Sequence, residues 1–159
     1  MYIDLITVGK LKERYWREAC LEYEKRLSRY HKLKTITVAD EKDPADQGAK
    51  AIAKVCQLEG QRIEQKIAPH SYVIALDVKG NRYDSEGFAQ HLAQLESRGH
   101  THLTLIIGGS HGLSPAVLTQ ANERISFSDF TFPHQLMRVI LLEQVYRASR
   151  INAGEPYHK

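Results

Sequence analysis

The sequence predicts an α/β fold: one domain with a mainly parallel sheet and helices on both faces. Short runs of apolar and β-branched residues alternate with longer segments of helical spacing, which is typical of repeated βα units. Two of these runs, residues 72–78 and 103–107, are almost wholly apolar, as expected for central strands that helices cover on both sides. The chain has 159 residues, of which 42% are hydrophobic and 26% charged, so residues 1–159 suit a single globular domain.

The first half of the chain is predicted to form three strands and two helices, with one acidic loop. Alternating, β-branched residues indicate strands, and apolar residues every three or four positions indicate helices. In order, the expected elements are a strand at 2–8, a helix at 11–29, a strand at 35–38, a helix at 47–67 and a strand at 72–78. Pro44 interrupts the acidic loop, and the glycine within residues 79–81 indicates a turn after the third strand.

The second half continues the alternation and is predicted to end in a long helix. The expected elements are a helix at 85–98, a strand at 103–107, a helix from 114, a strand at 125–132 and a helix at 134–152. Ser85 and Ser114 are placed to cap the helices that they begin, and Pro115 suits a first helical position. Gly99 suits the end of a helix.

The last predicted helix is apolar on nearly every side. Its apolar residues are Leu136, Met137, Val139, Ile140, Leu141 and Leu142. A helix that is apolar all round must be buried all round, whereas a terminal helix in so small a domain has one face for its own sheet. We therefore expect a homodimer that covers the other face, although a helix sunk centrally in one subunit would show the same pattern.

Two sharp breaks at strand ends indicate a ligand pocket. The strand at 103–107 runs into the glycine-rich residues 108–113, and the strand at 125–132 meets Pro133. The carboxyl ends of parallel strands meet at one edge of a sheet, where ligands bind. Glycines let the backbone approach such a ligand closely. Their spacing is neither G-x-G-x-x-G nor that of a P-loop, so no dinucleotide or P-loop site is predicted.

The glycine-rich segment also matches G-x-S-x-G, the nucleophile motif of α/β-hydrolases. Ser110 would be the nucleophile, and Asp129 with His134 or His158 would complete a triad in the right chain order. In that fold the serine leads directly into a helix, whereas here the helix signal starts four residues later. The chain is also short for a hydrolase, so this interpretation carries little weight.

Basic residues are concentrated in the N-terminal third of the chain. Between Lys10 and Lys34 there are nine Lys or Arg residues against four Glu, interspersed with aromatic residues. This composition suits contact with an RNA backbone. A solvated helix face with ion pairs explains it equally well.

The N-terminus and the cysteines indicate a cytoplasmic protein without a metal or membrane contact. Cys20 and Cys56 are far apart in predicted helices and form no metal-binding spacing. The N-terminus has no basic region before its first strand, and no apolar run is long enough to span a bilayer.

Two arginines of the last helix and the C-terminal tail are further candidates. Arg138 interrupts a buried apolar run without an acid one turn away, so it needs an anion or a carbonyl partner. Arg147 follows Glu143 by four residues, which predicts an ion pair. The tail residues 157–159 suit stacking on a base and proton transfer, although a chain end is ordinarily frayed.

Several motifs of the C-terminal half are specific in combination. They are Ile107-Gly108-Gly109, Gly112-Leu113, Phe132-Pro133-His134, Arg138-Val139, Glu143-Gln144, Tyr146-Arg147-Ala148 and Tyr157-His158-Lys159. Together they resemble the ribosomal large subunit methyltransferase H family, of the SPOUT class. The resemblance covers the whole chain, although His111 is not part of the family motif.

This resemblance implies a C-terminal trefoil knot, a homodimer and S-adenosylmethionine as the cofactor. It implies methylation of N3 of a pseudouridine (position 1915) in helix 69 of 23S rRNA, on the 70S ribosome. The family's cofactor positions fall on Leu76, Gly108, Phe127, Ser128, Asp129, Phe130, Thr131 and Phe132. Arg147, Tyr157 and His158 would serve the RNA and the chemistry, with His158 as the base.

Overall fold

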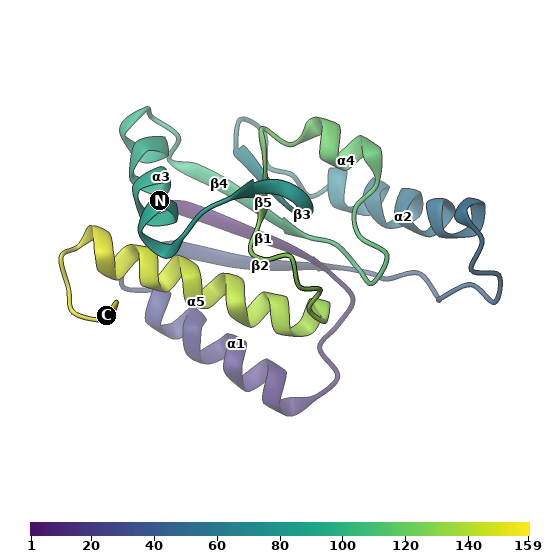
Figure 1. The fold of residues 1–159 in the computed structure, drawn as a ribbon, viewed down its shortest axis with the longest axis horizontal. Coiled ribbons are helices and arrows are strands. Elements are labelled where there is room, and N and C mark those ends of the chain that lie inside the picture. Colours follow the sequence, from purple (N-terminus) through teal and green to yellow (C-terminus); the bar gives the residue numbers. More distant parts are fainter.

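The computed structural model describes residues 1–159 and contains a five-stranded sheet between two layers of helices (Figure 1). The strands are β1 (Tyr2–Val8), β2 (Lys32–Val38), β3 (Tyr72–Arg82), β4 (His102–Ile107) and β5 (Glu123–Ser126). The helices are α1 (Arg14–Leu27), α2 (Ala49–Glu64), α3 (Ser85–Ser97), α4 (Pro115–Gln120) and α5 (His134–Asn152). The strand order is β2-β1-β4-β3-β5 and every neighbouring pair is parallel, which confirms the predicted α/β fold.

Each face of the sheet has its own hydrophobic core. On one face α5 packs between α1 and α3, over a cluster that includes Ile3 and Leu5 of β1. On the other face α2 and α4 cover a cluster that includes Ile6 and Val8 of the same strand. Successive side chains of a strand point to opposite faces, so a strand covered on both sides is apolar throughout. This explains the continuous apolar run of residues 103–107.

Helix α5 is largely buried within the subunit. Its buried residues are Arg138, Leu141, Leu142, Val145, Tyr146, Ala148 and Ser149. The half-buried residues Leu136, Val139, Ile140, Glu143 and Arg147 form a stripe along the opposite side of the helix. The central position of α5 thus accounts for most of its apolar residues, and the homodimer stays a prediction.

The turn predicted at residues 79–81 is wrong, because β3 continues through it to Arg82. The pairing of β3 with β5 shifts register between Leu76 and Asn81. A Cβ added to Gly80 would lie 2.6 Å from backbone atoms of Arg124 and Ile125, two residues of β5. Glycine here permits two strands to approach closely instead of reversing the chain.

Strand β5 is shorter than predicted and ends at Ser126. The Ser126 hydroxyl donates to the carbonyl of Ser128 at 3.2 Å, and the Phe130 N–H donates to the Ser128 hydroxyl at 3.0 Å. Such local bonds from serine compete with the strand ladder. Residues 127–132 therefore form a loop at the carboxyl end of the sheet.

Most helix ends follow the predicted signals. Ser114 caps α4 by accepting the N–H of Val117, and Gly99 has a φ of +90° after α3. The predicted cap of α3 is wrong, because the side chain of Asp84, and not that of Ser85, accepts the N–H of Gly87. Strand β2 also begins earlier than predicted, at Lys32.

The remaining predictions about the chain concern its thiols, its knot and membranes. Cys20 and Cys56 are both buried and unpaired. None of the helices combines the length and hydrophobicity of a transmembrane span. The trefoil knot stays a prediction.

Candidate functional site

A pocket lies where the carboxyl ends of β3, β4 and β5 meet. Its walls include residues 76–78 in the middle of β3, residues 107–110 at and after the end of β4, and the loop after β5. His134 and Met137, from the first turn of α5, complete it. The two strand-end breaks found in the sequence therefore face one another, as the parallel sheet requires.

The glycine loop after β4 is too tightly folded for side chains. A Cβ on Gly108 would be 2.8 Å from the backbone of Gly112, and Gly112 itself has a φ of +83°. A Cβ on Gly109 would meet the carboxylate of Glu59 at 2.8 Å, so the loop lies directly on α2. The glycines serve the shape of the loop and expose its backbone to the pocket.

The residues of the hydrolase interpretation are not assembled into a triad. Ser110 is exposed in the turn, and its hydroxyl makes no hydrogen bond. Asp129 instead binds Arg82 through both carboxylate oxygens, and His158 contacts Arg147. The structure therefore gives no support to a serine nucleophile.

The loop after β5 lines the pocket and leaves its backbone without backbone partners. No N–H or C=O group of Phe127–Phe132 is bonded to another backbone group. Apolar side chains, including those of Leu76 and Ile125, lie across from it. Apart from the Ser128 C=O and the Phe130 N–H, which bond to serine hydroxyls, the backbone groups of this loop are without a partner. Backbone donors and acceptors of this kind beside apolar residues suit a heteroaromatic ring, whose edge needs hydrogen bonds and whose faces do not.

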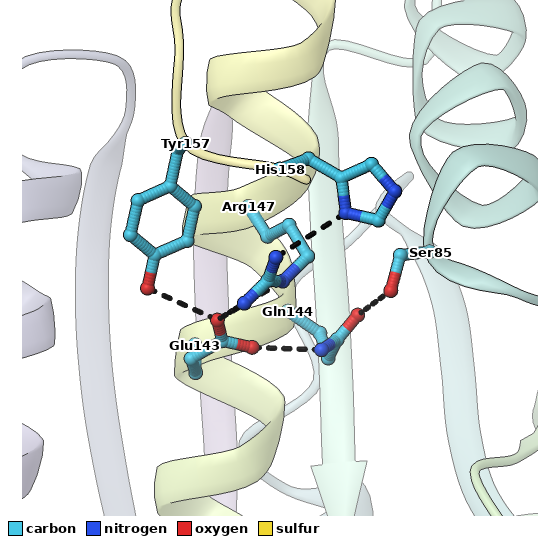
Figure 2. Close-up of polar contacts among 6 residues, drawn as sticks. All are labelled: Ser85, Glu143, Gln144, Arg147, Tyr157 and His158. Carbon is cyan, nitrogen blue, oxygen red and sulfur yellow. Dashed lines mark hydrogen bonds and ion pairs between the residues drawn. The ribbon is translucent and has the colours of Figure 1, made fainter.

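The three predicted catalytic residues come together around Glu143 (Figure 2). Glu143 Oε1 accepts from Arg147 Nη2 at 2.6 Å and from the Tyr157 hydroxyl at 3.1 Å. The guanidinium of Arg147 also lies 4.7 Å from the centre of the Tyr157 ring. Arg147 Nη1 is 3.2 Å from Nδ1 of His158. Since a guanidinium only donates, Nδ1 accepts this bond and carries no proton.

The surroundings of these three residues determine which of them donate hydrogen bonds and which accepts. Burial, together with the hydrogen bond to Glu143, raises the pKa of Tyr157 to about 12, so its hydroxyl stays protonated at neutral pH. The hydrogen bond to Glu143 also raises the pKa of Arg147. Tyr157 and Arg147 are therefore donors, and His158 is the member of the three with an unprotonated nitrogen.

Glu155 holds the C-terminal tail in place. Its Oε1 accepts from Arg29 Nη2 at 3.0 Å, and its Oε2 lies 3.0 Å from Arg150 Nη1 and accepts from the Tyr30 hydroxyl. Arg150 also donates to the carbonyl of Pro156 at 2.9 Å. The tail is thus fixed against α1 and α5 instead of frayed, and the sequence analysis did not single out Glu155.

A second pocket lies between α3 and α5 and adjoins the first. The two pockets share residues 125–128 and Phe132. On its other side the second pocket is lined by Ser85 and Gln144, which the sequence did not predict as site residues. Gln144 Nε2 donates to Glu143 Oε2 at 2.7 Å, which connects this pocket to the cluster of Figure 2.

Arg138 ties α5 to the carboxyl end of β1. Only 4% of the residue is exposed, and Nη2 donates to the carbonyl of Val8 at 2.9 Å and to that of Gly9. Burial lowers the pKa of its guanidinium. The prediction that Arg138 needs a carbonyl or an anion is confirmed, and its role is to position the helix that carries the site.

Comparison with known proteins decides the family. The model described as "Predicted SPOUT methyltransferase" matches residues 1–158. The chain is a SPOUT methyltransferase. A probable methyltransferase from Bordetella pertussis Tohama I is 12% identical, with a TM-score of 0.58 over 92% of this chain and 95% of its own. A probable methylase family protein from Haemophilus influenzae Rd KW20 is 10% identical, with a TM-score of 0.55 over 99% of this chain and 70% of its own. These two structures share the fold.

SPOUT methyltransferases generally use S-adenosylmethionine, and the first pocket of this SPOUT methyltransferase fits its adenosine part. The fit rests on the backbone groups of the loop after β5 that have no backbone partner and on the apolar residues that line the same pocket. Of the residues predicted to bind the cofactor, all but one line this pocket: Leu76, Gly108, Phe127, Ser128, Phe130, Thr131 and Phe132. The remaining one, Asp129, is held by Arg82 with 78% of its side chain exposed.

Proposed function

We propose that this chain is an S-adenosylmethionine-dependent methyltransferase that modifies N3 of a pseudouridine in helix 69 of 23S rRNA, on the 70S ribosome. The observation that carries the proposal is a pocket fit for adenosine near a cluster of a cation, a hydroxyl donor and an imidazole whose Nδ1 accepts a hydrogen bond. Family membership supports methyl transfer. The nucleotide is proposed from the resemblance of the sequence motifs, especially Tyr157-His158-Lys159.

The cofactor would be held by Leu76, by the glycine loop at Gly108 and by the backbone of Phe127–Phe132. When bound, S-adenosylmethionine supplies a methyl group on a positively charged sulfur. The chain need not activate that donor further. Its residues must orient the acceptor and make the acceptor nitrogen nucleophilic.

N3 of the pseudouridine ring is an N–H between two carbonyls, so it must give up its proton before it can take a methyl group. His158 would receive this proton. In the structure its Nδ1 is engaged by Arg147 and its Nε2 is 3.7 Å from Glu86. Arrival of the base would therefore draw Arg147 from His158 toward a ring carbonyl, where its charge stabilises the developing anion.

The RNA contact would lie at the start of α1. Lys10 and Lys12 are exposed and make no ion pair, and Tyr15 beside them is 62% exposed. At the far end of α1, Arg26 and Arg29 are paired with carboxylates, whereas the lysines at 25, 32 and 34 are exposed without an ion pair. Position therefore decides: Lys10 and Lys12 follow the carboxyl end of β1, the sheet edge that also carries the pocket. The proposal thus assigns RNA contact to the first part of the basic segment at residues 10–34 and not to the remainder of it.

A homodimer is part of the proposal. The half-buried stripe on α5 begins with three apolar residues, Leu136, Val139 and Ile140. Burial of such a stripe against a second copy would be favourable. Size-exclusion chromatography with light scattering tests this, and a monomer at micromolar concentration would contradict it.

The decisive experiment is transfer of tritium from S-adenosyl-[methyl-³H]methionine to 70S ribosomes that lack the helix 69 methyl group, followed by nuclease mapping. The expected result is label on the pseudouridine. Absence of label, from a folded protein that binds the cofactor, would show that the substrate is wrong. Binding of the cofactor is measured separately by thermal stabilisation.

A further inference from the structure

The proposed cofactor residues and the proposed catalytic residues do not line one common pocket. The acceptor base must nevertheless reach both, because its N3 meets the methyl donor and gives its proton to His158. The second pocket adjoins the cofactor pocket and is linked to the catalytic group through Gln144, although Arg147, Tyr157 and His158 do not line it themselves. It shares residues 125–128 and Phe132 with the cofactor pocket, and it ends at Gln144, whose amide is bonded to Glu143.

We infer that the second pocket receives the acceptor pyrimidine, and that Gln144 with Ser85 recognises a ring edge made of an N–H beside a C=O. This inference rests on the proposed function and names the base-recognition site for it. Phe127 and Ile140 give the pocket apolar walls, and the buried Phe88 packs edge to face against Phe127 with ring centroids 6.1 Å apart, which holds the Phe127 ring in place. Stacking on such walls is general for extruded bases.

The hydrogen-bonding capacity of Gln144 matches that edge. One N–H of Nε2 is donated to Glu143, and Oε1 accepts the hydroxyl of Ser85 at 2.8 Å (Figure 2). An amide has two N–H groups and two lone pairs on oxygen. One N–H and one lone pair therefore remain unused on the Gln144 amide, and together they complement a ring C=O and its neighbouring N–H.

This geometry distinguishes pseudouridine from uridine. Pseudouridine is joined to ribose through carbon, so its N1 carries a proton beside the C2 carbonyl. In uridine N1 is bonded to the ribose and offers no proton. Recognition of N1–H and C2=O by Gln144 leaves N3 free for His158, and Glu143 fixes the two recognition groups relative to one another by binding Gln144 and Arg147 together. Gln144 is thus a specificity-determining residue.

The test compares two ribosome substrates, one with pseudouridine and one with uridine at the target position. Gln144→Leu keeps the size of the side chain and removes its hydrogen bonds. We expect kcat/KM on pseudouridine ribosomes to fall about tenfold to 100-fold, with a smaller loss on uridine ribosomes, so that the preference collapses. Cofactor binding, measured by calorimetry, should match that of the wild type. The matched control is Gln90→Leu, at an exposed position of α3 with no hydrogen bond from its side chain.

A second variant keeps the inference testable if Gln144→Leu fails to fold. Ser85→Ala removes one member of the pair without touching the core and should lower the preference in the same direction, about threefold. A preference equal to that of Gln90→Leu in both variants overturns the inference. If the wild type itself labels neither ribosome, the proposed function fails instead, so the two failures are distinguishable.

Discussion

The pocket at the glycine loop and the cluster around Glu143 are built in opposite ways. In the pocket the backbone contributes many of the polar groups, because Phe127–Phe132 leaves its N–H and C=O groups without backbone partners, beside a few polar side chains such as Asp77 and His134. In the cluster every polar contact is made by a side chain, and Glu143 accepts from Arg147, Tyr157 and Gln144. Substitutions should therefore act on the pocket through the shape of its loops, and on the cluster through charge and hydrogen bonding.

The largest effect is expected at the cluster, from His158→Ala. Loss of the proton acceptor should lower kcat about 100-fold to 10,000-fold, with cofactor affinity unchanged. Single-turnover transfer of tritiated methyl groups to 70S ribosomes measures it. Lys159→Ala, at the exposed neighbouring position, is the control. Equal rates for the two variants would remove His158 from the chemistry.

The next effect is expected at the pocket, from Gly108→Ala. The new methyl group would lie 2.8 Å from the backbone of Gly112 and would displace the loop. We expect cofactor affinity, measured by calorimetry, to fall about 30-fold, which corresponds to about 2 kcal/mol. Ser110→Ala is the control and should retain both binding and activity. A serine hydrolase would give the reverse order, with Ser110→Ala inactive.

A smaller effect is expected where the tail is fixed. Glu155→Ala removes the acceptor that Arg29, Tyr30 and Arg150 share. The tail should become mobile, so that the amides of residues 154 and 155, which are bonded to the carbonyls of Ile151 and Arg150, exchange with solvent faster and turnover falls about fivefold. Hydrogen exchange by mass spectrometry is the measurement, with Glu64→Ala on α2 as the control. Unchanged protection of these amides would show that other contacts hold the tail.

The smallest effect concerns Glu59, a carboxylate that contrasts with Glu143. Glu59 is 5% exposed beneath the glycine loop, and its Oε2 has no hydrogen-bond partner. Burial raises its pKa from 4.5 to about 6, with a further contribution from Asp40. The folded state therefore holds this proton more tightly than the unfolded state. The stability that the protonated group contributes is full below pH 4.5 and is lost as the pH rises through 6.

Glu59→Gln should remove this pH dependence. The variant should be more stable than the wild type at pH 8 by about 1 kcal/mol and nearly equal to it at pH 4. Urea unfolding at the two pH values measures the difference. A destabilisation of the variant at pH 8 would mean that the charged form of Glu59 has a partner in solution.

The sequence predicted a helix or strand boundary correctly where residues close to that boundary in the chain determine it. Ser114 caps α4 through its own third neighbour, and β1 and α5 have the predicted bounds. The predictions failed where a distant strand or a side chain decided the outcome. Gly80 is in a strand because β5 lies against it, and the predicted last strand ends early because Ser126 and Ser128 bond within the loop.

In the candidate site, too, contacts between residues near in the sequence were predicted and contacts between distant residues were not. Its motifs predicted the glycine loop, and the four-residue spacing predicted the pair of Arg147 with Glu143. The partners of Gln144 and Glu155 were out of reach, because Ser85 is 59 positions from Gln144 and Arg29 is 126 positions from Glu155. No periodicity links residues so far apart. Only the packing of α3 and α1 against α5 brings them together.

The pocket's reliance on backbone groups has a consequence for drug resistance. A competitor that bonded to the free N–H and C=O groups of the loop after β5 would depend little on side-chain identity. Replacement of a side chain there leaves the backbone donors and acceptors in place, whereas a change in loop shape would also disturb the enzyme's own cofactor. Escape by point mutation from such an inhibitor should therefore be rare and should also weaken binding of the cofactor proposed for this pocket.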